Sequence, residues 1–204
     1  MSTKNSKSLG ILRETSLYFL STLPVMVGSA ISPGLKTIAE ADAFSSIANV
    51  EFLSKMSLAF PAFAFAISAL LIGYLIDRIG RKPVLITSLI IYIVAGSIGF
   101  YVHNLYVILV GRVFIGIAAA GVMTTTITLI SDYYTGEKRN RVLGFQVAFG
   151  ALGAVIYTLI GSALSDVAWN YPFLLFFFPA LLIPSTIFLL PEPSKEELLE
   201  NDAL

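Results

Sequence analysis

The chain has 204 residues, of which 56% are hydrophobic and 13% are charged, and its mean hydropathy is +0.84. A soluble domain carries roughly 25% charged residues, so this composition cannot cover a water-facing surface. Thirteen basic and thirteen acidic residues cancel, which argues against the basic face that a nucleic-acid-binding protein needs. Cysteine is absent and histidine occurs once, which excludes disulfides, cysteine nucleophiles and multi-histidine metal centres. The composition predicts a membrane protein surrounded by lipid.

Six apolar stretches are each long enough to cross a bilayer, which takes roughly 20 helical residues. They run over residues 15–36, 53–76, 83–103, 106–131, 140–164 and 171–190. The sequence therefore predicts a short N-terminal segment over residues 1–14, a transmembrane bundle over 15–190 and an acidic tail over 191–204. Proline-rich sequence ends the last stretch, because proline cannot continue a helix.

Basic residues alternate between the two sides of these stretches. Ten precede the first stretch or follow the second, fourth and sixth: Lys4, Lys7, Arg13, Arg78, Arg81, Lys82, Lys138, Arg139, Arg141 and Lys195. The other loops hold only Lys36 and Lys55. Because cytoplasmic loops carry the excess of basic residues, both termini are predicted to be cytoplasmic. A signal peptide cleaved near residues 28–30 would break this alternation, so we predict that the first helix is retained.

The loop between the second and third stretches gathers charge and glycine over residues 73–82. It contains Gly73, Asp77, Arg78, Gly80, Arg81 and Lys82. Gly80 permits a tight backbone turn, and the three basic residues need no role beyond setting topology. Topology does not explain Asp77, because a carboxylate at a membrane boundary costs free energy unless it is paired.

The spacing Gly-x-Leu-x-Asp-Arg-x-Gly-Arg-Lys in this loop resembles the loop between helices two and three of the major facilitator superfamily of secondary transporters. The resemblance covers about residues 15–193, including segments 131–144 and 169–173. It implies that Asp77 lies against a helix start in another half of the transporter. It also implies that Arg81 pairs with Asp132 at the end of the fourth helix, in a latch that favours the outward-open state. The alternative is a hairpin that only sets topology.

Arg112 is the one basic residue well inside an apolar stretch. An unpaired guanidinium there costs roughly 2.5–3.5 kcal/mol, so it must face the bundle interior or snorkel outward. The resemblance favours the interior, because the family's fourth helix carries Arg-x-x-x-Gly, here Arg112 and Gly116, implicated in proton coupling. In the fifth stretch, Gly150, Gly153 and Gly161 form a small-residue face that predicts close helix packing.

The resemblance implies an all-α fold of six transmembrane helices in two inverted repeats of three, which is half of the family's twelve-helix fold. It implies secondary active transport of a small solute, with drug or metabolite efflux coupled to protons as the expected form. A second six-helix half, on the same or another chain, would complete the transporter in a bacterial cytoplasmic membrane. The alternative is a non-transporting regulatory or structural membrane protein descended from a transporter. We expect no enzyme activity, because the lone His103 at a loop edge cannot serve a nucleophile within the bundle, and we expect no cofactor or metal.

Overall fold

The structure is a computed structural model that describes residues 2–45, 47 and 49–192, with side chains from Leu9 onward. The side chains of Lys4 and Lys7, and the tail residues Lys195, Glu196, Glu197, Glu200 and Asp202, lie outside it. Every regular element in the described part is a helix. The long ones are α1 (Ser2–Ser29), α3 (Val50–Ile79), α4 (Arg81–Tyr101), α5 (Leu105–Tyr133) and α6 (Gly136–Val167). The sixth span joins a 3₁₀ segment, η3 (Tyr171–Leu181), to α7 (Leu182–Leu189).

Six segments are long and apolar enough to cross a membrane, which confirms the predicted number of spans. They run over Leu9–Ala39, Val50–Ile79, Arg81–Tyr101, Leu105–Tyr133, Gly136–Val167 and Tyr171–Leu189. The first span includes two short elements after α1, η1 (Ser32–Gly34) and α2 (Leu35–Ala39), and η2 (Asp42–Phe44) follows it. The chain is thus an integral multi-pass membrane protein.

Local chemistry explains where the helices begin and end. A single residue, Gly80, separates α3 from α4, and its φ of +99° lies in a region that glycine adopts readily. Asn104 caps α5 because its side chain accepts hydrogen bonds from the backbone amides of Tyr106 at 3.0 Å and Val107 at 3.4 Å. The sixth span departs from a continuous α-helix where Pro179 lies within η3, since proline lacks the amide that an α-helix needs.

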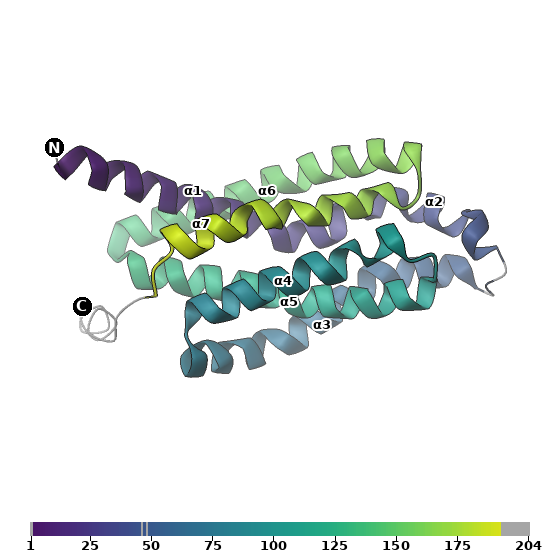
Figure 1. Cartoon of the computed structure of the whole chain (residues 1–204), viewed down its shortest axis with the longest axis horizontal. Helices are drawn as coiled ribbons and strands as arrows, with labels where there is room; N and C mark the ends of the chain where they lie inside the picture. The colour runs from purple at the N-terminus through teal and green to yellow at the C-terminus, as the bar shows by residue number, and fades with distance from the viewer. Residues whose placement is uncertain (1, 46, 48, 193–204) are drawn as a thin grey trace.

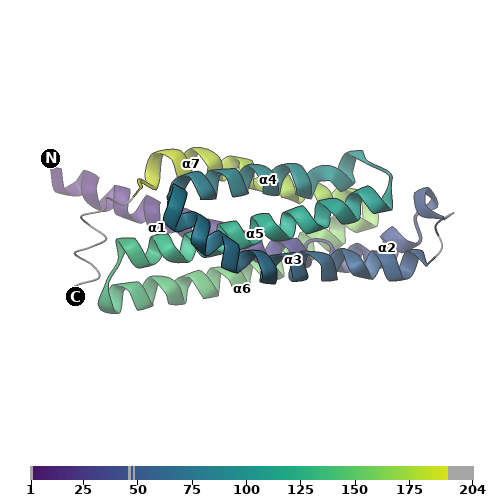
Figure 2. The same cartoon turned by 90° about the horizontal axis from the view of Figure 1, so that it is seen from below.

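The helices run side by side along the long axis of the molecule (Figure 1). Figure 2 shows α4 and α7 along one side and α3 and α6 along the other, with α5 and α1 between them. The packing is symmetric, because α3 packs on α5 as α6 packs on α1, while α4 packs on η3. If spans one, two and three are exchanged with spans four, five and six, each of these packed pairs becomes a packed pair of the same set. This is expected for two inverted repeats.

Burial differs sharply between the inner and outer helices. The most apolar part of α5 is 67% buried and that of the first span is 56% buried, whereas the corresponding parts of α3 and α6 are only 22% buried. Exposed apolar side chains line both outer helices, including Phe63 and Leu70 on α3 and Leu152 and Leu159 on α6. In lipid such faces are stable, and they are equally able to pack on further transmembrane helices.

Close contact between α6 and α1 depends on glycine. A Cβ atom added at Gly161 would lie 2.2 Å from the backbone oxygen of Ala30, and one added at Gly153 would lie 3.0 Å from Cβ of Thr22. Gly150 leaves more room, with the backbone oxygen of Ser21 at 3.8 Å. All three glycines predicted to pack against a helix therefore face the first span, and Gly161 makes the closest approach.

Replacement of Gly161 by alanine is expected to destabilise the protein. The new methyl group would overlap backbone that cannot rotate away, a strain of roughly 1–3 kcal/mol, while the gain in helix propensity returns up to about 1 kcal/mol. We expect a net loss of about 1 kcal/mol in the free energy of unfolding, measured by denaturation in detergent micelles. Gly144→Ala is the matched control, because a Cβ there meets nothing within 4 Å. An equal or greater stability of Gly161→Ala relative to Gly144→Ala would contradict this packing.

Candidate functional site

The loop between α3 and α4 lies against the end of α5. Arg81 Nε donates to Asp132 Oδ2 at 3.0 Å, and the two side chains are only 16% and 13% exposed. The structure thus forms the ion pair between the two residues that the family resemblance brings together. Asp77 and Arg78 are exposed at the end of α3. Asp77 forms no ion pair with residues 9–45, 47 or 49–192, and the guanidinium of Arg78 lies 5.2 Å from the ring centroid of Tyr74.

Glu192 caps the start of α4 from the far end of the chain. Its Oε1 accepts a hydrogen bond from the backbone amide of Arg81 at 2.6 Å, and its Oε2 accepts one from the amide of Lys82 at 2.7 Å. The first amides of a helix have no partner within the helix and carry a partial positive charge, so a carboxylate is a favourable cap. Glu192 was not among the residues predicted from the sequence to form the site. Its position directly after the proline that ends the sixth span was the only signal.

Two basic side chains bind the C-terminal end of α7. Lys82 Nζ donates to the backbone oxygen of Ile187 at 2.6 Å, and Arg13 Nε donates to that of Leu189 at 3.2 Å. Basic side chains stabilise the unpaired carbonyls at a helix C-terminus. The hydroxyl of Tyr133 donates to the backbone oxygen of Pro191. We call this connected set, Arg13, Arg81, Lys82, Asp132, Tyr133 and Glu192, the basic-end cluster.

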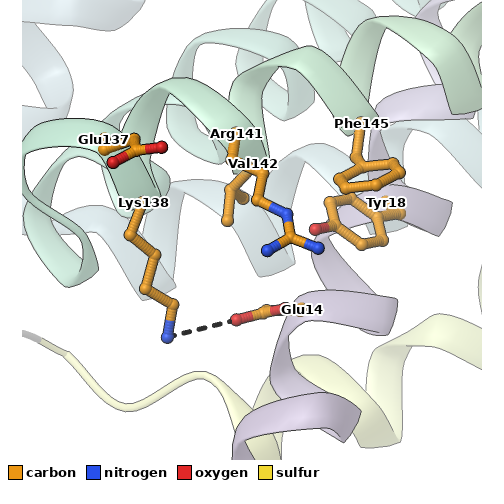
Figure 3. A pocket seen from close by; sticks show the side chains of 7 residues that line it. All are labelled: Glu14, Tyr18, Glu137, Lys138, Arg141, Val142 and Phe145. Carbon is orange, nitrogen blue, oxygen red and sulfur yellow. Dashed lines mark ion pairs between the residues drawn. The ribbon is translucent and has the colours of Figure 1, made fainter.

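A pocket of about 670 Å³ lies beside this cluster, between α1 and the start of α6 (Figure 3). It is lined by Glu14, Tyr18, Glu137, Lys138, Arg141, Val142 and Phe145. Lys138 Nζ lies 3.4 Å from Glu14 Oε1, and the guanidinium of Arg141 points toward Glu14 and the hydroxyl of Tyr18 in the figure. Burial raises the pKa of the nearby Tyr134 to about 12, and the charge of Glu14 adds to this effect. The hydroxyl of Tyr134 therefore stays protonated near neutral pH.

Arg112 lies in the interior of the bundle, where it is 2% exposed. Its Nη1 donates to the backbone oxygen of Val27 at 3.3 Å. Its guanidinium carbon lies 5.0 and 5.1 Å from the ring centroids of Phe173 and Phe176, within the range of cation–π contacts. The side chain of Arg112 therefore faces the bundle interior and does not snorkel outward.

A cavity of about 350 Å³ opens between α1, α3 and α5, near the middle of these helices. Its lining comprises Pro24, Val25, Val27, Gly28, Leu58, Pro61, Ala62, Phe65, Gly116 and Ala119, none of them charged. Gly116 lies against the backbone of Pro61, since a Cβ there would be 2.3 Å from the Pro61 oxygen. Gly28 instead faces open space, because a Cβ atom added there would meet nothing within 4 Å. Glycine and proline on neighbouring helices thus shape a hollow with apolar walls.

The family model described as the Major Facilitator Superfamily matches residues 17–203, which is most of the chain. The chain belongs to the major facilitator superfamily. Among solved structures, a D-xylose–proton symporter superposes with a TM-score of 0.69 at 14% identity, covering 95% of this chain and 50% of that one. The xylose transporter XylE of E. coli, in an inward-open conformation, superposes with a TM-score of 0.67 at 18% identity and also covers 50% of that chain. These likenesses show the fold, and the six helices form a half-length major facilitator domain.

The curated relatives include one protein named as a transporter and another named as a multidrug resistance protein. The niacin transporter NiaP of Acinetobacter baylyi is 30% identical over 128 residues, which cover 62% of this chain and 29% of the relative. The multidrug resistance protein MdtG of Enterobacter lignolyticus is 29% identical over 155 residues, which cover 76% of this chain and 36% of the relative. The match thus spans about a third of these relatives' length.

Proposed function

We propose that this chain is one half of a secondary active transporter for a small solute. The observation that carries the proposal is the apolar cavity between α1, α3 and α5, on a domain whose outer helices α3 and α6 are largely unburied. In this superfamily, substrate binds between two six-helix halves that rock about it. One bundle supplies one wall of such a pathway. A second six-helix half, on the same or another chain, supplies the other.

The proposal also includes the direction of transport and its coupling to protons. Efflux coupled to protons is the form that we propose, and the multidrug resistance protein and the niacin transporter among the relatives support a drug or a metabolite as the solute. The basic-end cluster faces the cytoplasm of a bacterium in this proposal, because basic residues are retained on that side. Arg81 and Asp132 form a latch that must open when the halves rock, and Glu192 caps the helix start that carries Arg81.

Flux measurements in proteoliposomes test this function. The chain is reconstituted alone and together with the second six-helix half of the Acinetobacter niacin transporter. Radiolabelled nicotinate and ethidium serve as probes, with and without an imposed pH gradient. We expect flux above empty liposomes when two halves are present, and its loss when an uncoupler removes the gradient. Folded protein without flux in any arrangement would contradict transport and favour the structural or regulatory alternative.

A further inference from the structure

Arg112 is a charge that the described protein does not neutralise. No Asp or Glu in the described ranges forms an ion pair with it, and its Nη2 has no hydrogen-bond partner there. It lies seven residues after the start of α5, or about 10 Å along the helix. A guanidinium buried at such a depth is costly unless an anion or a polar partner compensates it. The one backbone carbonyl and the two phenylalanine rings provide dipoles and quadrupoles but no negative charge.

The main chain of α1 connects this charge to the apolar cavity. Ile31 N donates to the oxygen of Gly28 at 3.2 Å, so it does not take the carbonyl of Val27 that a continuing α-helix would assign to it. Arg112 uses that carbonyl instead. Val27 itself lines the cavity, as does Gly116, one helical turn after Arg112. The guanidinium therefore lies directly behind the wall formed by Val27.

The cavity and the charge together specify a class of ligand. The walls offer apolar contact through Pro24, Leu58 and Phe65 and no side-chain carboxylate or amine. An uncompensated cation beside a low-dielectric cavity favours anions and disfavours cations. From this we infer that the cavity binds the apolar body of an organic anion, with Arg112 as the residue that selects its charge. This inference rests on the proposed transport function and names its substrate class.

Binding of three isosteric probes tests the inference on the full chain. Naphthoate, naphthylmethanol and naphthylmethylamine share one ring system and carry a negative charge, no charge and a positive charge at neutral pH. The chain is placed in nanodiscs of neutral phosphatidylcholine, and probe fluorescence is corrected with empty nanodiscs. We expect naphthoate to bind at least about tenfold more tightly than the other two. Arg112→Gln should abolish this preference, whereas Arg112→Lys should retain most of it.

A second pair of variants tests the location without altering the charge. Gly28→Leu places a side chain in the cavity, where no atom blocks its Cβ, and should weaken binding of all three probes. Gly144→Leu is the matched control in α6, because its Cβ also meets nothing within 4 Å, and it should leave binding unchanged. Equal binding of the three probes, tighter binding of the amine, or no binding of any probe would overturn the inference. Flux with the partner half is measured separately, so transport of uncharged or cationic solutes would contradict this inference while leaving transport intact.

Discussion

Asp132→Asn is expected to lower the free energy of unfolding by about 3 kcal/mol. Arg81 and Asp132 pair at 3.0 Å with little exposure of either side chain, and loss of one partner leaves the other charge desolvated and uncompensated. Removal of one member of a buried pair typically costs 3–5 kcal/mol, and the partial exposure here places the effect near the lower end. Denaturation in detergent micelles measures the change.

An exposed ion pair in the same protein provides the control for this prediction. Lys55 and Glu51 lie 2.7 Å apart, but their side chains are 64% and 75% exposed. Lys55→Gln should therefore change stability by less than about 1 kcal/mol, as is usual for surface pairs. The double variant Arg81→Gln/Asp132→Asn should recover part of the loss, because no charge remains unpaired. If Asp132→Asn and Lys55→Gln had equal effects, the buried pair would not stabilise this end of the bundle.

Glu192→Ala is expected to destabilise the first turn of α4. Loss of a capping side chain costs up to about 2 kcal/mol, and both bonds here are made by a charged acceptor. The amides of Arg81 and Lys82 are the two that lose their partner. They should exchange with deuterium faster than in the unmodified protein, by a factor of about 30 for 2 kcal/mol.

Glu192→Gln separates the charge from the hydrogen bonds in this cap. The amide oxygen can still accept one bond from the helix start, but the interaction with the helix dipole is lost. Exchange at Arg81 and Lys82 should therefore lie between the values for the unmodified protein and Glu192→Ala. Exchange at Tyr106 and Val107, which Asn104 caps, should not change. Unaltered exchange at Arg81 in Glu192→Ala would show that the carboxylate does not hold this turn in solution.

The sequence predicted the spans well because membrane helices leave a strong signal. Twenty or so apolar residues are required for each crossing, and most of the predicted stretches lie inside the observed spans. The third and sixth extend slightly too far, past Tyr101 and Leu189. Elsewhere the helices are longer than predicted, since α3 continues to Ile79 and α6 begins at Gly136. Polar residues can continue a helix beyond the hydrocarbon, so apolar composition does not mark where a helix ends.

The contacts that define the candidate site were predictable only in part. The family resemblance predicted that Arg81 pairs with Asp132, which lies 51 residues away. Composition alone could not have predicted this contact. Glu192 was not predicted because its partners are backbone amides 110 and 111 residues away. Almost every residue has a backbone amide, so the sequence does not indicate which ones a side chain contacts. The position of Arg112 was open for a similar reason, since its partner is the Val27 carbonyl that a change of hydrogen bonding after α1 sets free.

Impermeant-maleimide labelling of single cysteines tests the transmembrane arrangement most directly, because the natural chain contains no cysteine. Asn140→Cys and Asp166→Cys place one thiol near each end of the same helix, α6, at exposed positions. We predict that Asp166→Cys reacts in intact cells and that Asn140→Cys reacts only after the membrane is permeabilised. Reaction of Asn140→Cys in intact cells would place the basic-end cluster outside the cell and contradict the proposed latch and half-transporter together.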